Sequence, residues 1–200
     1  MIDSKEKLRG AYPPAKEGSL KKQLTRLDGH CLRFLELSPF VVLSSGTVEG
    51  GFDASPRGGD PGFVKAPDAE TLLIPDAPGN NRLDTLENII ANGRLGLLFL
   101  IPGVDETLRV NGRARLQDDV SLIEYFRTEK RVPKIVIEVK VEDVYLHCAK
   151  ALMRSKLWSA ESRVERTVLP TMGQMLKDQL GLQTPAESQE QMVERYKTQL

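Results

Sequence analysis

Six short segments in the middle of the chain carry the apolar pattern of β-strands. In residues 107–116 and 135–146, apolar and polar positions alternate with the period of two that a strand shows when one face packs on a core. Residues 95–101 are apolar throughout, which predicts a strand buried on both faces. Strands that follow one another without regular helical crossovers favour an antiparallel barrel or sandwich. The other three are short runs over residues 40–45, 52–55 and 71–75.

Helical spacing of apolar residues marks other segments. Residues 20–37 repeat apolar positions at intervals of three and four, with a break near Asp28-Gly29. Residues 118–128 predict a short helix. Residues 83–92 predict a helix that ends at Asn92-Gly93, with its apolar stripe formed by Leu83, Leu86, Ile89 and Ile90.

The two ends of the chain are more polar than its middle. Residues 1–19 contain two glycines and two prolines, and they predict an irregular arm. A short helix is predicted over residues 171–180, with methionine and leucine on one side. Residues 183–200 are rich in Glu and Gln, which predicts a frayed or disordered end.

Composition and charge narrow the class of protein. The 28 Lys and Arg residues balance 28 Asp and Glu residues, so we expect no nucleic-acid partner. The longest apolar run is far shorter than the roughly 20 residues that span a bilayer, and the charged residues 1–7 lack the apolar core of a signal peptide. Two cysteines are too few for a disulfide framework, which favours a reducing compartment. We therefore predict a cytoplasmic protein with no membrane partner.

Each histidine of the chain directly precedes a cysteine, as His30-Cys31 and His147-Cys148. Together these four residues have the donor types of a structural zinc site. However, the side chains of adjacent residues diverge on a strand or helix, so they rarely reach one metal. We therefore predict no metal site and interpret both cysteines as small core residues.

Two motifs suit anion binding. They are Ser55-Pro56-Arg57-Gly58 and Pro78-Gly79-Asn80-Asn81-Arg82. Each places one arginine beside residues that form turns, where backbone N–H groups can approach a ligand closely. The guanidinium group donates two parallel hydrogen bonds and matches a phosphate. Arg82 also precedes the predicted helix, whose N-terminal N–H groups favour an anion.

With these motifs, residues 28–158 resemble the pyridoxamine 5'-phosphate oxidase-like FMN-binding split-barrel family, in its bacterial branch with Ser-Pro-Arg-Gly and Pro-Gly-Asn-Asn-Arg. The resemblance implies a mainly β fold with peripheral helices, built on a six-stranded antiparallel split β-barrel. It divides the chain into an N-terminal arm and helix (1–27), the split-barrel domain (28–158) and a partly flexible helical extension (159–200). It also implies an oxidoreductase that acts on a small molecule, and a homodimer with the flavin at the subunit interface.

The family also suggests which residues bind the FMN cofactor. Arg57 and Arg82 are expected as the main contacts, with Ser55 and Asn81 beside them. Residues 154–158, which read Arg-Ser-Lys-Leu-Trp, are expected over the isoalloxazine ring, where Trp158 would offer an aromatic surface. Polar contacts there would come from Arg154, Ser155 and Lys156. An amphipathic helix end with a half-buried tryptophan is the structural alternative for this segment.

The sequence departs from the true pyridoxamine phosphate oxidases. Those enzymes carry an Arg-x-His pair, whereas no histidine follows His147 here, and Asn-Asn-Arg-Leu replaces their Arg-Lys pair. Flavin binding is therefore a better inference than vitamin B6 activity, and we assign no catalytic residue. Three alternatives stay open: a vitamin B6 enzyme, a non-enzymatic protein that binds or senses a flavin or related cofactor, and a split barrel without a cofactor.

Overall fold

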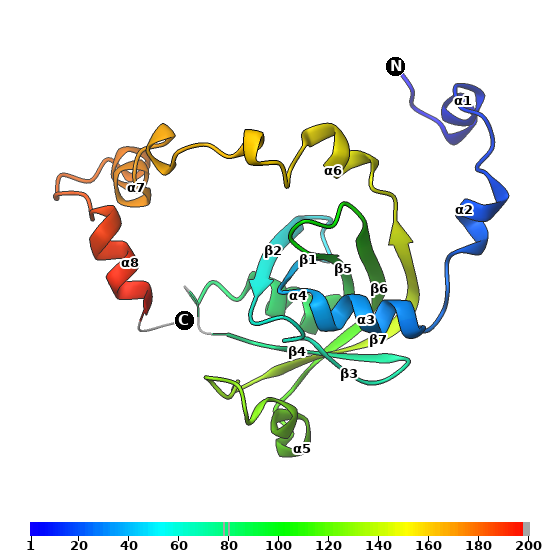
Figure 1. Ribbon diagram of the computed structural model, residues 1–200, viewed down its shortest axis with the longest axis horizontal. Helices are drawn as coiled ribbons and strands as arrows, with labels where there is room; N and C mark the ends of the chain where they lie inside the picture. The colour runs from blue at the N-terminus through cyan, green and yellow to red at the C-terminus, as the bar shows by residue number, and fades with distance from the viewer. Residues whose placement is uncertain (78, 80, 198–200) are drawn as a thin grey trace. The chain divides into compact units, whose positions relative to one another are not determined.

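The structure is a computed structural model that describes residues 1–77, 79 and 81–197 of the 200-residue chain. The chain divides into two compact units, Met1–Arg154 and Ser155–Leu200. The first unit contains the β-sheet and most of the helices (Figure 1). The three-part division expected from the sequence stays a prediction.

Seven strands of the described residues form one antiparallel sheet in the order β2-β1-β5-β6-β7-β4-β3. This confirms the predicted antiparallel β fold, with seven strands in place of six. The additional strand is β3, whose four residues include a proline and pair irregularly with β4. The strands are β1 (Phe40–Gly46), β2 (Phe52–Gly58), β3 (Lys65–Asp68), β4 (Thr71–Pro75), β5 (Arg94–Leu100), β6 (Thr107–Gln117) and β7 (Val136–His147).

The sheet curls, so that β1, β2 and β5 lie on one side of the core and β3 and β4 on the other (Figure 1). The pairing of β6 with β7 shifts between Asn111 and Gly112, which is the pattern of a β-bulge. Gly112 is required there, because a Cβ atom at this position would collide with the carbonyl oxygen of Lys140. A bulge bends its strand and increases the local twist, which helps these two long strands to follow the curl.

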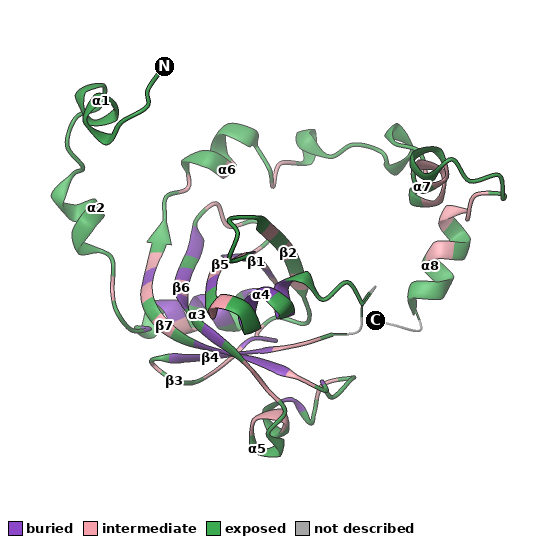
Figure 2. Cartoon of the chain, turned by 180° about the vertical axis from the view of Figure 1, so that it is seen from behind, coloured by how far each residue is buried: buried purple, intermediate pink, exposed green. Residues whose placement is uncertain are grey.

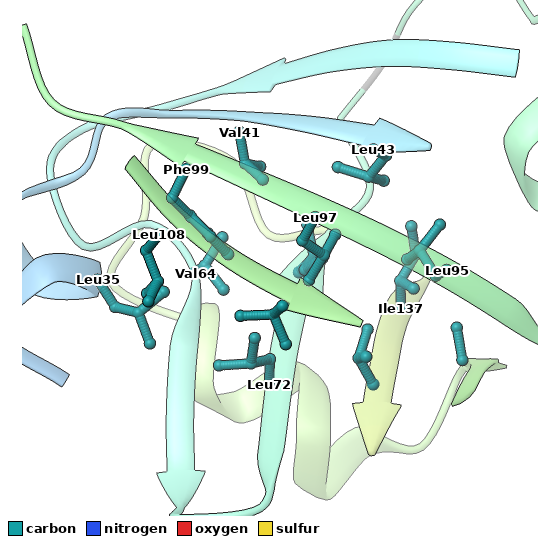
Figure 3. Close-up of a cluster of buried hydrophobic side chains, with 14 of the residues drawn as sticks. Leu35, Val41, Leu43, Val64, Leu72, Leu95, Leu97, Phe99, Leu108 and Ile137 are labelled. Carbon is teal, nitrogen blue, oxygen red and sulfur yellow. The ribbon is translucent and has the colours of Figure 1, made fainter. Parts of the chain in front are cut away.

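One hydrophobic cluster fills the interior of the curled sheet (Figure 3). On β5, Leu95, Leu97 and Phe99 are buried, whereas Leu98 and Leu100 on the opposite face are half-buried. One chain therefore covers only one face of this strand completely, and the expected burial of the other face stays a prediction. On the outer side of β4 and β7, a second cluster of Leu73, Phe126 and Val136 packs under α5 (Val120–Ile123) and the 3-10 helix η1 (Glu124–Phe126). This short pair of helices occupies the segment where the sequence predicts one.

Two further helices of the first unit contribute buried residues to the cluster inside the sheet. The break expected in the N-terminal helical pattern is confirmed, because α3 (Gly29–Leu37) begins at Asp28, whose side chain accepts a hydrogen bond from the Cys31 N–H. Helix α4 (Asp84–Asn92) ends at Gly93 in the left-handed conformation, as predicted. Figure 2 shows both helices with buried residues on one side.

The N-terminal arm holds α1 (Lys5–Gly10) and α2 (Glu17–Lys21), so the expectation of an irregular segment is wrong there. Neither helix has a buried residue. Helix α6 (Lys150–Ser155) follows β7 at the end of the first unit.

The second unit contains short helices and no buried residue among those described. Its α7 (Met172–Leu180) matches the helix predicted over residues 171–180. The expectation of a frayed end is wrong for α8 (Gln189–Lys197), where Arg195 forms a double hydrogen bond with Glu187. The unit also contains the 3-10 helices η2 (Ala160–Ser162) and η3 (Arg166–Val168).

Candidate functional site

The inner face of β2 is polar, although its strand neighbour β1 supplies core residues. Asp53, Ser55 and Arg57 are half-buried, while the residues between them are exposed. They share one face because alternate residues of a strand point the same way. β2 is an edge strand, and Pro56, which has no N–H, fits such a position. The strand predicted over residues 52–55 left Arg57 in a turn, but β2 extends to Gly58 and Arg57 lies within it.

Arg57 carries the least satisfied polar group of this face. Its Nη1 donates to the Ser55 hydroxyl at 2.9 Å. Its Nη2 lies 3.8 Å from a carboxylate oxygen of Asp76, which follows β4. The Nε–H is buried and has no hydrogen-bond partner among the described residues. A buried donor without an acceptor is costly, so this guanidinium is suited to a further acceptor from a ligand.

Asp76 completes this part of the site from the other side of the core. Its side chain, like that of Arg57, is only 24% exposed. Burial raises the pKa of the Asp76 carboxyl, although the nearby Arg57 charge opposes this effect. The sequence analysis missed Asp76, because β2 and β4 are not neighbours in the sheet and no local pattern links the two residues.

The N-terminus of α4 forms the second part of the site. Asn81 and Leu83 flank Arg82 and both have left-handed backbone angles, with φ of 59° and 60°. Such angles are uncommon outside glycine and often mark functional segments. Leu83 at the N-cap has no side-chain acceptor, so the N–H groups of the first helical turn are not capped by it.

Arg82 lies at this helix start, as the sequence predicts. Its Nε donates to Asp84 at 2.8 Å, and the side chains are 75% and 46% exposed. This hydrogen bond raises the pKa of the Arg82 guanidinium, and the charge of Asp53 on β2 adds to the effect. An exposed pair of this kind contributes little to stability, so a phosphate can compete for Arg82. Pro78 and Asn80 of the same motif lie outside the described residues.

A buried polar stripe fixes α4 against β1 and β2. The Thr85 hydroxyl donates to Asp53 at 2.5 Å, and the Asn88 amide donates to the Ser45 hydroxyl at 2.9 Å. Thr85 and Asn88 are 3% and 7% exposed. The sequence pattern placed Leu83 and Ile90 on the buried side instead, and both are exposed. These bonds hold the start of α4 beside the polar face of β2.

The remaining predicted contacts lie near the boundary between the two units. Arg154 belongs to α6, and Lys156 and Trp158 belong to the second unit. Lys156 has a left-handed φ of 49°, and its amine pairs with Glu161 at 3.3 Å. Ser155 accepts a hydrogen bond from the Ser162 hydroxyl through its carbonyl oxygen. The roles of residues 154–158 stay predictions.

The described residues contain no group of three or more His, Cys, Asp and Glu that could hold a metal ion. Cys31 is buried as expected, but Cys148 is exposed, so its interpretation as a core residue is wrong. In the same part of the chain, no helix is both long enough and apolar enough to cross a membrane.

Residues 27–148 match the sequence profile of the pyridoxamine 5'-phosphate oxidase family, which is more than half of the chain. The chain belongs to this family. A search of curated proteins found no match. The structure of HupZ from group A Streptococcus is similar in fold, with a TM-score of 0.51 and 16% identity over 60% of this chain and 93% of HupZ.

Two further solved structures are less similar. The FAD-binding protein of Mycobacterium smegmatis has a TM-score of 0.44 and 16% identity over 62% of this chain and 97% of its own. An FMN-binding protein of Syntrophomonas wolfei has a TM-score of 0.44 and 9% identity over 58% of this chain and 81% of its own. The family match and the antiparallel sheet together establish the split-barrel fold inferred from the sequence.

Proposed function

We propose that this protein is an FMN-binding flavoprotein, and an oxidoreductase that acts on a small molecule. The observation that carries the proposal is the pairing of a polar edge strand with an uncapped helix start. Arg57 on β2 has a buried N–H that finds no acceptor in the described part of the chain, and Arg82 stands at the N-terminus of α4. Membership of the pyridoxamine 5'-phosphate oxidase family supports a flavin as the ligand.

The residues present fit the two chemically different ends of FMN. The N–H groups at the start of α4, together with Arg82 and Asn81, suit the phosphate. Ser55 and Arg57 offer hydrogen bonds to the rest of the molecule along the inner face of β2. The bound flavin would supply the redox chemistry, and the protein would orient the ring and admit the substrate.

We also propose that the protein is a homodimer. The outer face of the sheet carries a row of residues paired across β2, β1 and β5, namely Pro56, Val42 and Leu98. Val42 and Leu98 are half-buried, and so is Leu100. An apolar sheet face that one chain leaves partly open suits the surface of a second copy. Light scattering of the flavin-loaded protein at micromolar concentration should give twice the chain mass, and a monomer would contradict the proposal.

The proposed cofactor is tested by titration. The purified protein should bind FMN and show the absorbance bands of an oxidised flavin, and riboflavin should bind much more weakly because it lacks the phosphate. Arg82→Ala should weaken FMN by roughly tenfold or more, since a charge-assisted hydrogen bond contributes about 1.5–3 kcal/mol. The affinity for riboflavin should stay the same. Unchanged FMN affinity in this variant would remove Arg82 from the site.

Turnover is a separate question from binding. Reduction of the bound FMN by a nicotinamide donor, followed as bleaching of its absorbance, would support the oxidoreductase assignment. If the protein binds FMN tightly but neither NADH nor NADPH reduces the bound FMN, a binding or sensing role is supported instead.

A further inference from the structure

Arg57 and Asp76 lie close together, but they do not satisfy each other's hydrogen-bonding groups. Their closest charged atoms are 3.8 Å apart, which is beyond hydrogen-bond distance. Both side chains are about three-quarters buried, with 24% exposed in each case. Among the described residues the Arg57 Nε–H has no acceptor, and burial has removed much of the water from the Asp76 carboxylate, whose only charged neighbour in that part of the chain is Arg57. Buried polar groups in proteins are almost always satisfied, so a third group is expected between or beside them.

Arg57 is a cationic donor and Asp76 is an anionic acceptor, and together they restrict the charge of that third group. A phosphate carries only acceptor oxygens when fully ionised, so it could accept from Arg57 but could not donate to Asp76. It would also bring like charges together in a poorly hydrated place, which is unfavourable. A neutral group with an acceptor beside a donor would satisfy both residues at once.

We propose that Arg57 and Asp76 form a subsite for an uncharged hydrogen-bonding edge in which a carbonyl lies beside an N–H, and that this edge is the pyrimidine side of the flavin ring. The ring carbonyl accepts from Arg57, and the ring N–H donates to Asp76. The phosphate is left to the start of α4, where Arg82 stands. This assignment rests on the proposed flavin ligand, and it makes Asp76 a specificity-determining residue.

The positions of the two residues agree with such a role. Arg57 reaches inward from the edge strand β2, and Asp76 follows the last residue of β4 on the other side of the core. The Ser55 hydroxyl holds one side of the guanidinium, and the Asp76 backbone N–H donates to the Ile135 carbonyl at 3.0 Å. Both groups are therefore held in place before a ligand arrives, which lowers the entropy cost of binding.

The first test replaces Asp76 by asparagine and measures the Kd for FMN and for riboflavin. Asp76→Asn should weaken both ligands by the same factor, roughly fivefold, because the asparagine oxygen can accept only an uncharged and weaker hydrogen bond from the ring N–H that both ligands share. The exposed Asp60 serves as the matched control, and Asp60→Asn should change neither Kd. If Asp76→Asn tightens FMN and leaves riboflavin unchanged, Arg57 binds the phosphate and the inference is wrong. Unchanged affinity for both ligands would also overturn it.

The second test leaves the protein intact. An FMN analogue methylated at the pyrimidine N–H keeps the phosphate but cannot donate to Asp76, so it should bind the wild-type protein about tenfold or more weakly than FMN. Equal affinity for the two compounds would overturn the subsite. If the wild-type protein binds neither FMN nor riboflavin, the proposed function fails and this inference fails with it. If FMN binds but these discriminations are absent, only this inference fails.

Discussion

The inner faces of β1 and β2 differ sharply, although the two strands pair residue by residue. Val41 lies opposite Arg57, and Leu43 lies opposite Ser55. Both β1 residues are fully buried, and both β2 residues are half-buried. β1 has a strand on each side, whereas β2 is at the edge of the sheet. The comparison indicates that the interior strand provides stability, while the edge strand accommodates polar side chains that are available to the proposed ligand.

The largest expected effect separates these two roles directly. Leu43→Ala should lower the free energy of unfolding by about 2–5 kcal/mol, because it leaves a cavity in the core. The matched variant Ser55→Ala, on the opposed residue of β2, should change it by less than about 1 kcal/mol. Urea denaturation followed by circular dichroism measures both. A similar loss in the two variants would mean that β2 is as much a part of the core as β1.

A second variant tests how the polar face of β2 is held against α4. Thr85→Val removes the hydroxyl that donates to Asp53 and leaves that carboxylate with one donor fewer, at a cost of about 1–3 kcal/mol in the free energy of unfolding. Thr85→Ser keeps the hydroxyl and should recover most of the loss. FMN affinity should also fall in Thr85→Val, since the start of α4 would no longer be fixed beside β2. Equal unfolding energies for the valine and serine variants would show that the hydroxyl contributes nothing.

The contrast between the strands also explains what the sequence could predict. Strands such as β4 and β6 follow from local alternation or apolar runs, and the Asp28 cap and Gly93 end of the helices follow from local chemistry. The strand β3 has no local signal, because its pairing with β4 is set by the fold. In α4 the apolar pattern favoured Leu83 and Ile90 as buried residues, but the helix instead turns Thr85 and Asn88 toward polar partners on β1 and β2.

The residues of the candidate site also differ in whether a local sequence pattern reveals them. Arg57 and Arg82 could be predicted from motifs, because each arginine stands beside glycine, proline or asparagine in the sequence. Asp76 could not, since its contact with Arg57 is made between strands that are distant in the sheet order.

Glu138 on β7 is a buried carboxylate that differs from Asp76, because side-chain donors form hydrogen bonds with it. It accepts hydrogen bonds from Arg115 at 2.6 and 3.2 Å and from Gln117 at 2.5 Å. The Arg115 hydrogen bonds hold the pKa of this carboxyl below its ordinary range, although burial opposes them. A lowered folded-state pKa stabilises the protein above the ordinary carboxyl range, and that contribution is lost as the pH falls through the folded-state value.

Glu138→Gln should therefore lower the free energy of unfolding at pH 7 by on the order of 1 kcal/mol, a modest figure because Arg115 is exposed. The difference from wild type should shrink as the pH falls below about 4. Urea denaturation at several pH values measures this difference, and FMN affinity at pH 7 should not change. A constant difference at all pH values would show that ionisation of Glu138 does not contribute.

The smallest expected effect concerns the aromatic cover that a flavin on the polar face of β2 would need. Trp158 is the only tryptophan of the chain and is half-buried within the second unit. If it contacts the ring, Trp158→Ala should weaken FMN by about 1 kcal/mol, or roughly fivefold, and shift the flavin absorbance or reduction potential as water reaches the ring. Leu157→Ala, which truncates an exposed neighbour, is the matched control and should change none of these. Quenching of the tryptophan fluorescence by FMN is a weaker test, since energy transfer acts over a distance. If affinity, spectrum and potential all keep their wild-type values in Trp158→Ala, residues 154–158 are a structural helix end and do not cover the ring.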